Sequence, residues 1–543
     1  MKIKNPILKG FNPDPSITKK EDKYYIATST FDWMPGVQIH ESSDLINWEL
    51  VSHPIDDLKL LDMRGNLDSG GIWAPDLSYY DGKFWLVYSN VQVVNGSFKD
   101  VKNYLITAED IRGPWSDPIF LNGIGFDASL FHDDDGKKYL VQMQWDHRPY
   151  NHPFMGIRCT EYDHKSKKLV KDNSKIIWKG TGIKLTEAPH LYTMFGYYYL
   201  FCAEGGTTYS HSETVSRSKE IFGDYEGQPE IFMTAFDSPY NDLQKCGHGS
   251  LVKTDNDEWY FAHLTARPWH HSYESAIDPR GWCTLGRETA IQKVYWDDDK
   301  WPHILGGKEG SVEVDAPKIF KDVINKNDEA IKQFDDFDDY KLDINFNTVR
   351  VPFEQIGKIE DSKLVLKGSG SLSNHQEHSL VARRWQNFKF KAETKMIYDP
   401  NSHQQLAGLS NYYNTTHWSM IALTYDEEVG KCIEVLETNR GNLECYLKNT
   451  IQVPDDTKEI YFRTTVDTQF YTYQYSLDGN EWIDTGIKLY AKVLSDDYVN
   501  QTYGGFFTGA FVGMVNIDYT GYNNEAKFEY FKYEEEDWMW KKY

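Results

Sequence analysis

Four carboxylic acids and a histidine recur at regular intervals between residues 14 and 248. Asp14, Asp76, Asp127, Glu187 and His248 open the segments "DPSIT", "DLSYY", "DASLF", "EAPHLY" and "HGSLV", at intervals of 62, 51, 60 and 61 residues. Carboxyl groups crowded into a partly dry site cannot all ionise at one pH, so at least one keeps its proton near neutrality. A protonated carboxyl beside an ionised one is the arrangement that hydrolysis of a glycosidic bond requires.

Each of these segments is followed by a turn and an aromatic segment of strand character. The five aromatic segments are "DKYYIATS", "GKFWLVYS", "GKKYLVQM", "GYYYLFCA" and "DEWYFAHL". Each pair is typical of a β-hairpin, and a repeat of this length with about four strands is typical of a propeller blade. We therefore predict an all-β fold that begins with a five-bladed β-propeller over residues 1–305.

The propeller explains why the acids recur in register. The first strand of every blade lines the central channel, so the five aligned groups should converge in one funnel. An isolated Asp-Pro such as Asp14-Pro15 usually marks a turn, but a turn does not explain alignment across five repeats. Asp76, in "WAPDLSYY", is interpreted as structural rather than catalytic.

The repeat stops after "WPHILGG", and the polar segment 306–332 is interpreted as a linker. Alternating strands with turns such as "LDGN" then predict a β-sandwich over residues 333–543. Its segment "YGGFFTGAFVG", Tyr503–Gly513, has glycines for close approach and two phenylalanines. The domain is either a carbohydrate-binding module or a domain that closes the active-site pocket; the family resemblance described below favours the second, with Phe506 rather than Phe507 at one end of the pocket.

Composition and charge exclude several classes of function. The net charge of −24 argues against nucleic acid or an anionic membrane as a partner and fits a small neutral substrate. None of the six cysteines lies in a CxxC pair, so a zinc site is not expected. The N-terminus lacks the apolar segment of a signal peptide, and no run of about 18 apolar residues occurs. We expect a cytoplasmic protein, and the flat aromatic sandwich is compatible with a homo-oligomer.

The motifs "NPDPS", "WAPD", "GFDASLF", "TEAPH" and "GHGS" resemble, in this order and spacing, the β-xylosidases of glycoside hydrolase family 43. The resemblance covers the whole chain. It implies a five-bladed propeller and an inverting mechanism in which Asp14 is the general base and Glu187 the general acid. Asp127 would raise the pKa of Glu187 and orient it, and Arg287 of "GWCTLGRETA" would contact the sugar hydroxyls.

Residues near the aligned acids are candidates for binding the substrate. Aromatic rings suit the flat apolar face of a sugar, and hydroxyl or imidazole groups suit its polar edge. The expected substrate-binding residues are Arg287, Phe31, Trp73, Phe126, Trp145, Thr207, His248 and Phe506. No metal or other cofactor is expected, although Ca²⁺ near His248 is an alternative use of the acidic ring.

These observations predict an exo-acting β-1,4-xylosidase that releases xylose from the non-reducing end of xylo-oligosaccharides. Activity on α-L-arabinofuranosides would accompany it, because both sugars present similar hydroxyls. The alternatives are an arabinofuranosidase or arabinanase on the same fold, and a non-catalytic sugar-binding propeller. A fructosidase is disfavoured because the chain has no "RDP" triplet.

Overall fold

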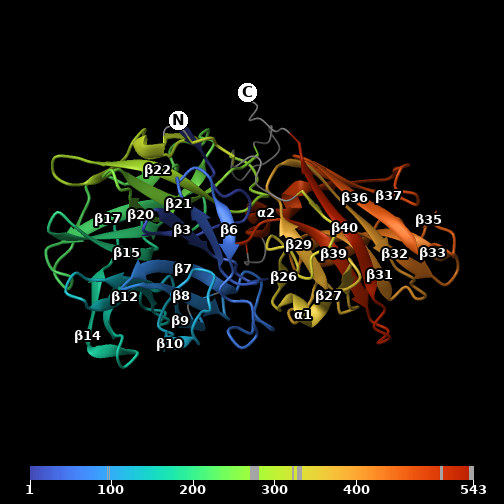
Figure 1. The fold of residues 1–543 in the computed structure, drawn as a ribbon, viewed down its shortest axis with the longest axis horizontal. Coiled ribbons are helices and arrows are strands. Elements are labelled where there is room, and N and C mark those ends of the chain that lie inside the picture. The colour runs from blue at the N-terminus through green and yellow to red at the C-terminus, as the bar shows by residue number, and fades with distance from the viewer. Residues whose placement is uncertain are drawn as a thin grey trace.

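The computed structural model describes residues 1–94, 96, 98–269, 280–320, 323–326, 333–501 and 506–536. Within these ranges the regular secondary structure is almost entirely β-strand. The helical elements there are α1 (Phe353–Ile356) and α2 (Asp496–Val499) with the 3₁₀ turns η1 (Lys318–Phe320) and η2 (Ala491–Leu494). None of the described helices is long and apolar enough to cross a membrane. Figure 1 shows two lobes side by side, one from each half of the chain.

The first lobe is the predicted five-bladed propeller, built from five antiparallel sheets. The blades are β2 (Ser16–Lys20), β3 (Lys23–Thr28), β5 (Gln38–Ser42) and β6 (Glu49–Ser52); β7 (Gly71–Tyr80), β8 (Lys83–Val91), β9 (Val101–Ala108) and β10 (Ile119–Asn122); β11 (Ser129–His132), β12 (Lys138–Trp145), β13 (Phe154–Asp163) and β14 (Lys168–Trp178); β15 (Glu187–Met194), β16 (Tyr197–Glu204), β17 (Ser212–Ser218), β18 (Glu226–Gly227) and β19 (Met233–Thr234); and β20 (Gln244–Lys253), β21 (Trp259–Ala266), β22 (Glu288–Trp296) and β23 (Pro302–Ile304).

The first strands β2, β7, β11, β15 and β20 contact one another in turn, and β20 contacts β2, so the ring is closed. The N-terminal segment fastens this closure. β1 (Lys2–Lys4) pairs with β24 (Glu313–Asp315), so the start of segment 306–332 belongs to the propeller wall. Leu8 and Thr289 of β22 exchange backbone hydrogen bonds of 3.2 and 3.3 Å. The beginning and the end of the propeller are thereby held together.

The second lobe is a β-sandwich, as predicted. One sheet has the order β27 (Gly357–Ile359), β28 (Leu364–Leu366), β40 (Ala526–Glu535), β30 (Lys389–Ile397), β36 (Glu459–Asp467), β37 (Phe470–Ser476) and β38 (Ile483–Tyr490), with β25 (Phe334–Asp335) beside β40. The other sheet has the order β29 (Leu380–Arg384), β39 (Phe511–Asp518), β31 (Gln405–Asn414), β32 (His417–Asp426), β33 (Gly430–Asn439) and β34 (Asn442–Cys445), with β35 (Ile451–Gln452) beside β33.

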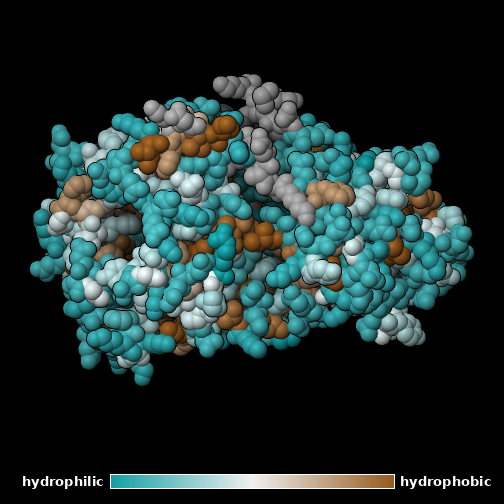
Figure 2. All heavy atoms as spheres, in the orientation of Figure 1, coloured by the Kyte–Doolittle hydropathy of each residue, from teal (hydrophilic) through white to brown (hydrophobic). Residues whose placement is uncertain are grey.

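Burial distinguishes the two sheets of the sandwich. Strands β30 and β36 alternate between buried and partly exposed residues, as expected for a sheet with one face in water. Strands β31 and β32 are buried along almost their whole length, because their second face packs on the propeller. There the Trp33 ring stacks on Phe511 with centroids 3.6 Å apart. The face seen in Figure 2 is mostly hydrophilic, with apolar residues near the middle, where the lobes meet, and at the top of the first lobe.

A buried arginine fixes the two lobes relative to each other. Arg350 is fully buried, and its Nη2 donates to Asp68 Oδ1 at 2.8 Å. Its Nε donates to the carbonyl of Asn66 at 2.9 Å, and Nη2 lies 3.2 Å from Asp32 Oδ2. Beside it, β26 (Thr348–Val349) pairs with β4 (Trp33–Met34) of the propeller. Removing one partner of such a buried network is costly, so the sandwich can supply a rigid wall to a site in the propeller.

Candidate active site

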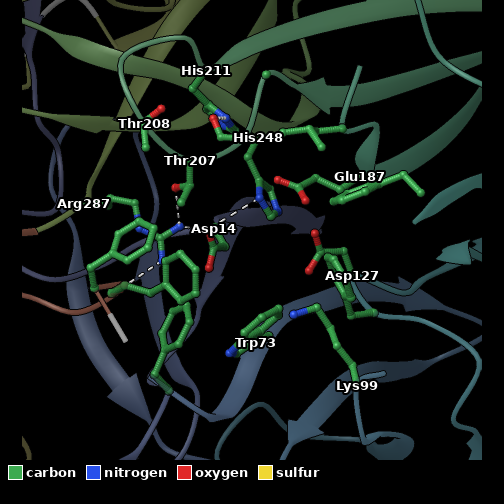
Figure 3. A pocket seen from close by; sticks show the side chains of 18 of the residues that line it. Asp14, Trp73, Lys99, Asp127, Glu187, Thr207, Thr208, His211, His248 and Arg287 are labelled. Atoms are coloured by element: carbon green, nitrogen blue, oxygen red, sulfur yellow. Dashed lines mark hydrogen bonds and ion pairs between the residues drawn. The ribbon is translucent and has the colours of Figure 1, made fainter. Parts of the chain in front are cut away.

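A cavity of about 330 Å³ lies at one end of the propeller channel. Such a volume suits a small ligand. The residues predicted from the sequence that line it are Asp14, Phe31, Trp73, Phe126, Asp127, Trp145, Glu187, Thr207, His248, Arg287 and Phe506. Figure 3 shows the labelled acids Asp14, Asp127 and Glu187 facing the same space. Residues from all five blades and from the sandwich therefore meet here.

The backbone at these positions turns the side chains into the cavity. Asp14, Asp127 and His248 have φ values of 56°, 51° and 46°, and Ala188, next to Glu187, has 49°. The pairing of β15 with β16 shifts register between Glu187 and His190, as a β-bulge does. Bulges and positive φ values in residues other than glycine are strained features that collect at functional sites.

The fivefold alignment predicted from the sequence is wrong at Asp76. In the hairpin of β7 and β8, Asp76 pairs with Val87, four residues before the strand ends at Tyr80. The matching residue of β15 is His190, four residues before Met194. Trp73, which precedes the bulge in β7, is the counterpart of Glu187. Sequence spacing could not reveal this, because the bulges add residues without adding rungs to the ladder.

Asp76 instead lines a second cavity, further along the same first strands. Its Oδ1 accepts a hydrogen bond from Ser16 Oγ at 3.1 Å, and its Oδ2 accepts one from the Leu130 N–H at 2.8 Å. His190 Nδ1 lies 3.5 Å from its Oδ1. Asp76 therefore ties together four blades, its own included, in agreement with the structural interpretation of its motif.

Asp14 is held as an ionised carboxylate. Its Oδ1 accepts a hydrogen bond from Arg287 Nη1 at 2.8 Å, and its Oδ2 accepts one from Ser29 Oγ at 2.6 Å. His248 Nδ1 lies 3.5 Å from Oδ1. Burial by itself would raise the pKa of Asp14, but Arg287, His248 and the Ser29 hydrogen bond prevail and lower that pKa. A carboxylate of this kind can accept a proton from water.

The pKa values of Glu187 and Asp127 are raised, whereas that of Asp14 is lowered. Burial and the charge of Asp14 raise the pKa of Glu187 to about 8, against the opposing charges of Arg287 and Lys99. Burial and the charges of Glu187 and Asp14 raise the pKa of Asp127 well above its ordinary value. The charge of Asp14 raises the pKa values of both acids, and the role that the resemblance assigned to Asp127 stays a prediction. Near neutral pH Glu187 holds a proton that it can donate.

Arg287 joins the two domains at the pocket. Its Nη1 also donates to Thr207 Oγ1 at 3.1 Å, and its Nη2 donates to the carbonyl of Phe507 at 3.0 Å. The guanidinium lies over the Phe31 ring, 5.2 Å from its centroid. Since Phe507 belongs to the sandwich, the second domain contributes directly to the placement of the residue that holds Asp14.

Aromatic rings form a continuous wall around the acids. The ring centroids of Phe31 and Trp73 lie 6.0 Å apart, those of Trp73 and Phe126 5.2 Å, and those of Phe126 and Trp145 5.9 Å. Such rings pack against the apolar face of a sugar. The wall is thereby built from residues of the first three blades.

The sandwich completes the wall with two phenylalanines. Phe506 was predicted, but Phe507 lines the cavity as well, and the two ring centroids are 4.5 Å apart. The Phe507 N–H donates to Ser69 Oγ at 3.0 Å, which fixes this loop to the propeller. Residues 503–505 of the predicted loop lie outside the described residues.

Sequence reasoning missed several residues that line the cavity, among them Lys99, Phe154, Leu185, Thr208 and His211. Lys99 lies in the loop between β8 and β9, where no strand register places it. The first glycine of "CGHGS", Gly247, indicates a close neighbour, and that neighbour is His211. A Cβ on Gly247 would lie 2.6 Å from His211 Cδ2. Chiefly because of burial, the pKa values of His211 and His248 fall to about 3 and about 4, so both rings are neutral near pH 7.

No group of three or more His, Cys, Asp or Glu residues in the described part of the chain is arranged to hold a metal ion. The calcium site considered near His248 stays a prediction. What the arrangement offers is an ionised carboxylate, a protonated carboxyl and an arginine around one small cavity. These are the groups that hydrolysis of a glycosidic bond by general acid and general base catalysis requires.

Comparison with known proteins agrees with this chemistry. Residues 3–302 match the family model of glycosyl hydrolases family 43. Residues 334–534 match the model of the β-xylosidase C-terminal concanavalin A-like domain. The β-xylosidase of Bacillus subtilis strain 168 is 51% identical over 539 residues, which are 98% of this chain and 100% of that protein.

Two further relatives also span the whole chain. The xylosidase/arabinosidase 43B of Humicola insolens is 43% identical and covers 98% of this chain and 97% of its own length. The crystal structure of xylan β-1,4-xylosidase from Bacillus halodurans C-125 is similar with a TM-score of 0.93 at 46% identity, over 98% of this chain and 100% of that one. The chain therefore belongs to glycosyl hydrolases family 43 and is a glycoside hydrolase.

Proposed function

We propose that the protein is an inverting, exo-acting β-1,4-xylosidase that releases xylose from the non-reducing end of xylo-oligosaccharides. One observation carries this proposal: Asp14, with a lowered pKa, and Glu187, with a pKa raised to about 8, line one small cavity. The relatives named above support the choice of substrate, since all three are described as acting on xylosides.

The reaction uses the two carboxyl groups in one step. A water molecule beside Asp14 gives its proton to the Asp14 carboxylate, and its oxygen attacks the anomeric carbon. The bond from that carbon to the glycosidic oxygen breaks, and the oxygen takes the proton of Glu187. Because water attacks from the face opposite the leaving group, the β-linkage gives α-xylose. Asp14 then returns its proton to solvent, and Glu187 takes one up.

The shape of the cavity supports exo action. Phe31, Arg287 and Phe507 lie together at one side, where the guanidinium contacts Asp14 and the Phe507 carbonyl. A wall there leaves room for the end of a chain rather than for its middle. The hydroxyls of the terminal sugar can then be held by Arg287, Thr207 and His248. The partner proposed for this site is a small neutral oligosaccharide.

The stereochemistry is the direct test. Proton NMR of xylobiose during hydrolysis should show α-xylose forming first, with β-xylose appearing later by mutarotation. Initial formation of β-xylose would contradict inversion, and absence of hydrolysis would contradict the choice of substrate. Release of xylose alone from xylohexaose, without shorter internal fragments at early times, would support exo action.

Activity on α-L-arabinofuranosides is a second part of the proposal. The Humicola insolens relative is named a xylosidase/arabinosidase, and a cavity that holds xylose can present the same donors to arabinofuranose. Comparing kcat/KM for 4-nitrophenyl β-xyloside and 4-nitrophenyl α-arabinofuranoside measures the partition. A large preference for the arabinoside would favour the alternative of an arabinofuranosidase, and cleavage of internal arabinan bonds would favour an arabinanase.

Three expectations from the sequence stay predictions. We propose that catalysis needs no metal ion, which would be contradicted if a chelator abolished the activity and Ca²⁺ restored it. Fractionation of the producing cells tests whether the enzyme works in the cytoplasm. Light scattering of the purified protein tests whether it is a homo-oligomer.

A further inference from the structure

A buried glutamate behind the cavity wall holds the loop that leads into Glu187. Glu204 is the last residue of β16 and is fully buried. Its Oε1 accepts hydrogen bonds from the Thr181 N–H at 2.8 Å and from Thr186 Oγ1 at 3.2 Å. Its Oε2 accepts one from Thr181 Oγ1 at 2.5 Å. One carboxyl group therefore binds both ends of residues 181–186, which we call the acid loop.

The backbone of the acid loop needs such support. Lys184 and Leu185 have φ values of 73° and 56°, in the left-handed region that residues with a Cβ rarely adopt. The Gly205 N–H donates to the carbonyl of Lys184 at 2.9 Å. Strained backbone persists only where neighbouring groups hold it. Here Glu204 and Gly205 hold the loop from the end of β16, the strand that pairs with β15.

The glycine before the acid loop shows how closely Glu204 fits. Gly180 has a φ value of 83°, and a Cβ there would lie 1.8 Å from Thr186 Oγ1 and 2.9 Å from Glu204 Oε1. A residue without a side chain is therefore required beside the hydrogen bond between Thr186 and Glu204.

The carboxyl group of Glu187 has no comparable support. Burial and the charges of Asp14, Arg287 and Lys99 act on it, and no hydrogen bond from the described residues contributes. Figure 3 shows this carboxyl pointing into the cavity. The position of Glu187 is therefore set by its backbone, which continues from Thr186. A group misplaced by about 1 Å can lose about 100-fold in rate.

We propose that Glu204 is a positioning residue for the proton donor: its carboxyl fixes Thr186 and thereby orients Glu187 toward the glycosidic oxygen. This inference rests on the proposed function, because it assumes that Glu187 is the general acid. Glu204 acts through hydrogen bonds and exchanges no proton with the substrate. A glutamine could accept the same bonds with its Oε1 and donate one to Thr181 Oγ1 with its amide group.

The test compares two substrates whose leaving groups differ in their need for a proton. The sugar that leaves from xylobiose needs the proton of the acid, whereas the phenolate of 2,4-dinitrophenyl β-xyloside leaves without one. In Glu204→Ala we expect kcat/KM to fall about 100-fold for xylobiose and less than about 10-fold for the dinitrophenyl xyloside. Glu204→Gln should stay within about threefold of the wild type for both. Equal losses for both substrates in Glu204→Ala, or equal losses in the two variants, would overturn the proposal.

Two threonine variants test the proposal even where Glu204→Ala does not fold. Thr186→Val removes one donor to Glu204, so activity on xylobiose should fall about 3- to 10-fold while activity on the dinitrophenyl xyloside is kept. Thr214→Val is the matched control, because Thr214 Oγ1 donates to the same Oε1 at 3.4 Å from β17, outside the acid loop. It should leave both activities unchanged. Equal behaviour of the two threonine variants would contradict the proposal.

The pH profile gives a readout that a purely structural role would not move. The charged and titratable groups that act on Glu187 are Asp14, Asp127, Lys99 and Arg287. Burial and Asp14 raise the pKa of Glu187 to about 8, so a loosened loop that admits water lowers that pKa. The alkaline limb of kcat/KM for xylobiose should therefore move to lower pH in Glu204→Ala and stay in place in Glu204→Gln. A limb that stays in place in Glu204→Ala, or moves to higher pH, would contradict the proposal.

Failure of this inference and failure of the proposed function give different results. If the wild-type enzyme does not hydrolyse xylobiose, the proposed function is wrong. If the wild type hydrolyses it and Glu204→Ala and Thr186→Val do so equally well, the inference about Glu204 alone is wrong.

Discussion

The propeller places carboxyl groups at two positions along one channel, and the hydrogen-bond partners of these groups differ. At the second cavity, Asp76 has both oxygens satisfied by Ser16 and Leu130, with His190 beside it. At the pocket, Glu187 and Asp127 face open space. Burial raises the pKa values of all three acids, so a raised pKa alone does not mark the catalytic residues.

The difference between Asp76 and Glu187 is whether the protein itself supplies hydrogen-bond partners for the carboxyl oxygens. Buried polar groups are normally paired within the fold, and exceptions need a reason. Asp76 is paired by residues of other blades and so holds the ring together. Glu187 is left for a substrate, and the charge of Asp14 keeps its proton in place. Glu187 is therefore recognised by the partners that the fold does not supply, whereas Asp14, whose oxygens accept from Arg287 and Ser29, is recognised by its place in the cavity.

The largest expected effect comes from removing the two groups that exchange protons. Glu187→Gln and Asp14→Asn should each lower kcat for xylobiose by about 10³-fold, because proton transfer in the transition state contributes about 10²- to 10⁴-fold. Steady-state kinetics with xylobiose measure this loss. Asp76→Asn should lower kcat less than about threefold on the same physical argument. If Asp76→Asn lowered kcat as much as Glu187→Gln does, the distinction between Asp76 as a structural acid and Glu187 as a catalytic acid would be wrong.

Replacing the arginine of the pocket should have the next largest effect. Arg287→Lys keeps the charge but cannot reach Asp14, Thr207 and the Phe507 carbonyl at once, since lysine has no planar fork. We expect kcat/KM to fall about 100-fold, corresponding to about 2.7 kcal/mol of lost transition-state stabilisation.

The interface arginine supplies the matched control for Arg287→Lys. Arg350→Lys should lower the free energy of unfolding by about 1–3 kcal/mol, because buried acceptors lose their donors. It should change kcat/KM far less than Arg287→Lys does. Urea unfolding and kinetics on both variants separate the loss of activity from the loss of stability. A loss of stability confined to Arg287→Lys would contradict these two expectations.

The pH dependence of kcat/KM should reflect the opposite shifts of the two acids. The base must be ionised, so activity falls as pH drops through the lowered pKa of Asp14. The acid must be protonated, so activity falls as pH rises through about 8, the raised pKa of Glu187. Beyond either limb the rate should change about tenfold per pH unit.

A pH–rate profile with 4-nitrophenyl β-xyloside, from acid to pH 10, measures both limbs. Asp76→Asn should leave both limbs where they are, because Asp76 lines the other cavity. An alkaline limb well below pH 7 would show that Glu187 is not held protonated by its surroundings.

Asp76→Ala should have the smallest effect on activity, although it should lower the stability of the protein. Asp76→Ala leaves Ser16 Oγ and the Leu130 N–H without their acceptor, so we expect about 1–3 kcal/mol less free energy of unfolding. The value of kcat/KM at 25 °C should stay within about threefold of the wild type, since no pocket residue is removed. Urea unfolding followed by tryptophan fluorescence measures the first quantity. Unchanged stability would mean that Asp76 does not tie the blades together.

The fold could be predicted because its signals are local and repeated. Turn residues between aromatic strands mark each hairpin, and five repeats leave few architectures. The register could not be predicted in full, since the bulge after Trp73 moves Asp76 out of the pocket. Lys99 escaped prediction because it lies on a loop, where neither period nor pairing places a side chain. Which sheet of the sandwich faces the propeller depends on packing between lobes that no single strand encodes.

The hydrogen bond from Arg287 to the Phe507 carbonyl has a consequence for protein engineering. It makes the accessory lobe a structural part of the catalyst, because a backbone atom of one lobe steadies the guanidinium that holds the base in the other. An excised propeller would bare the apolar ring of Trp33 and lose that anchor at the same time. Chimeric enzymes that exchange the C-terminal half would have to carry this stretch of chain with the propeller to remain active.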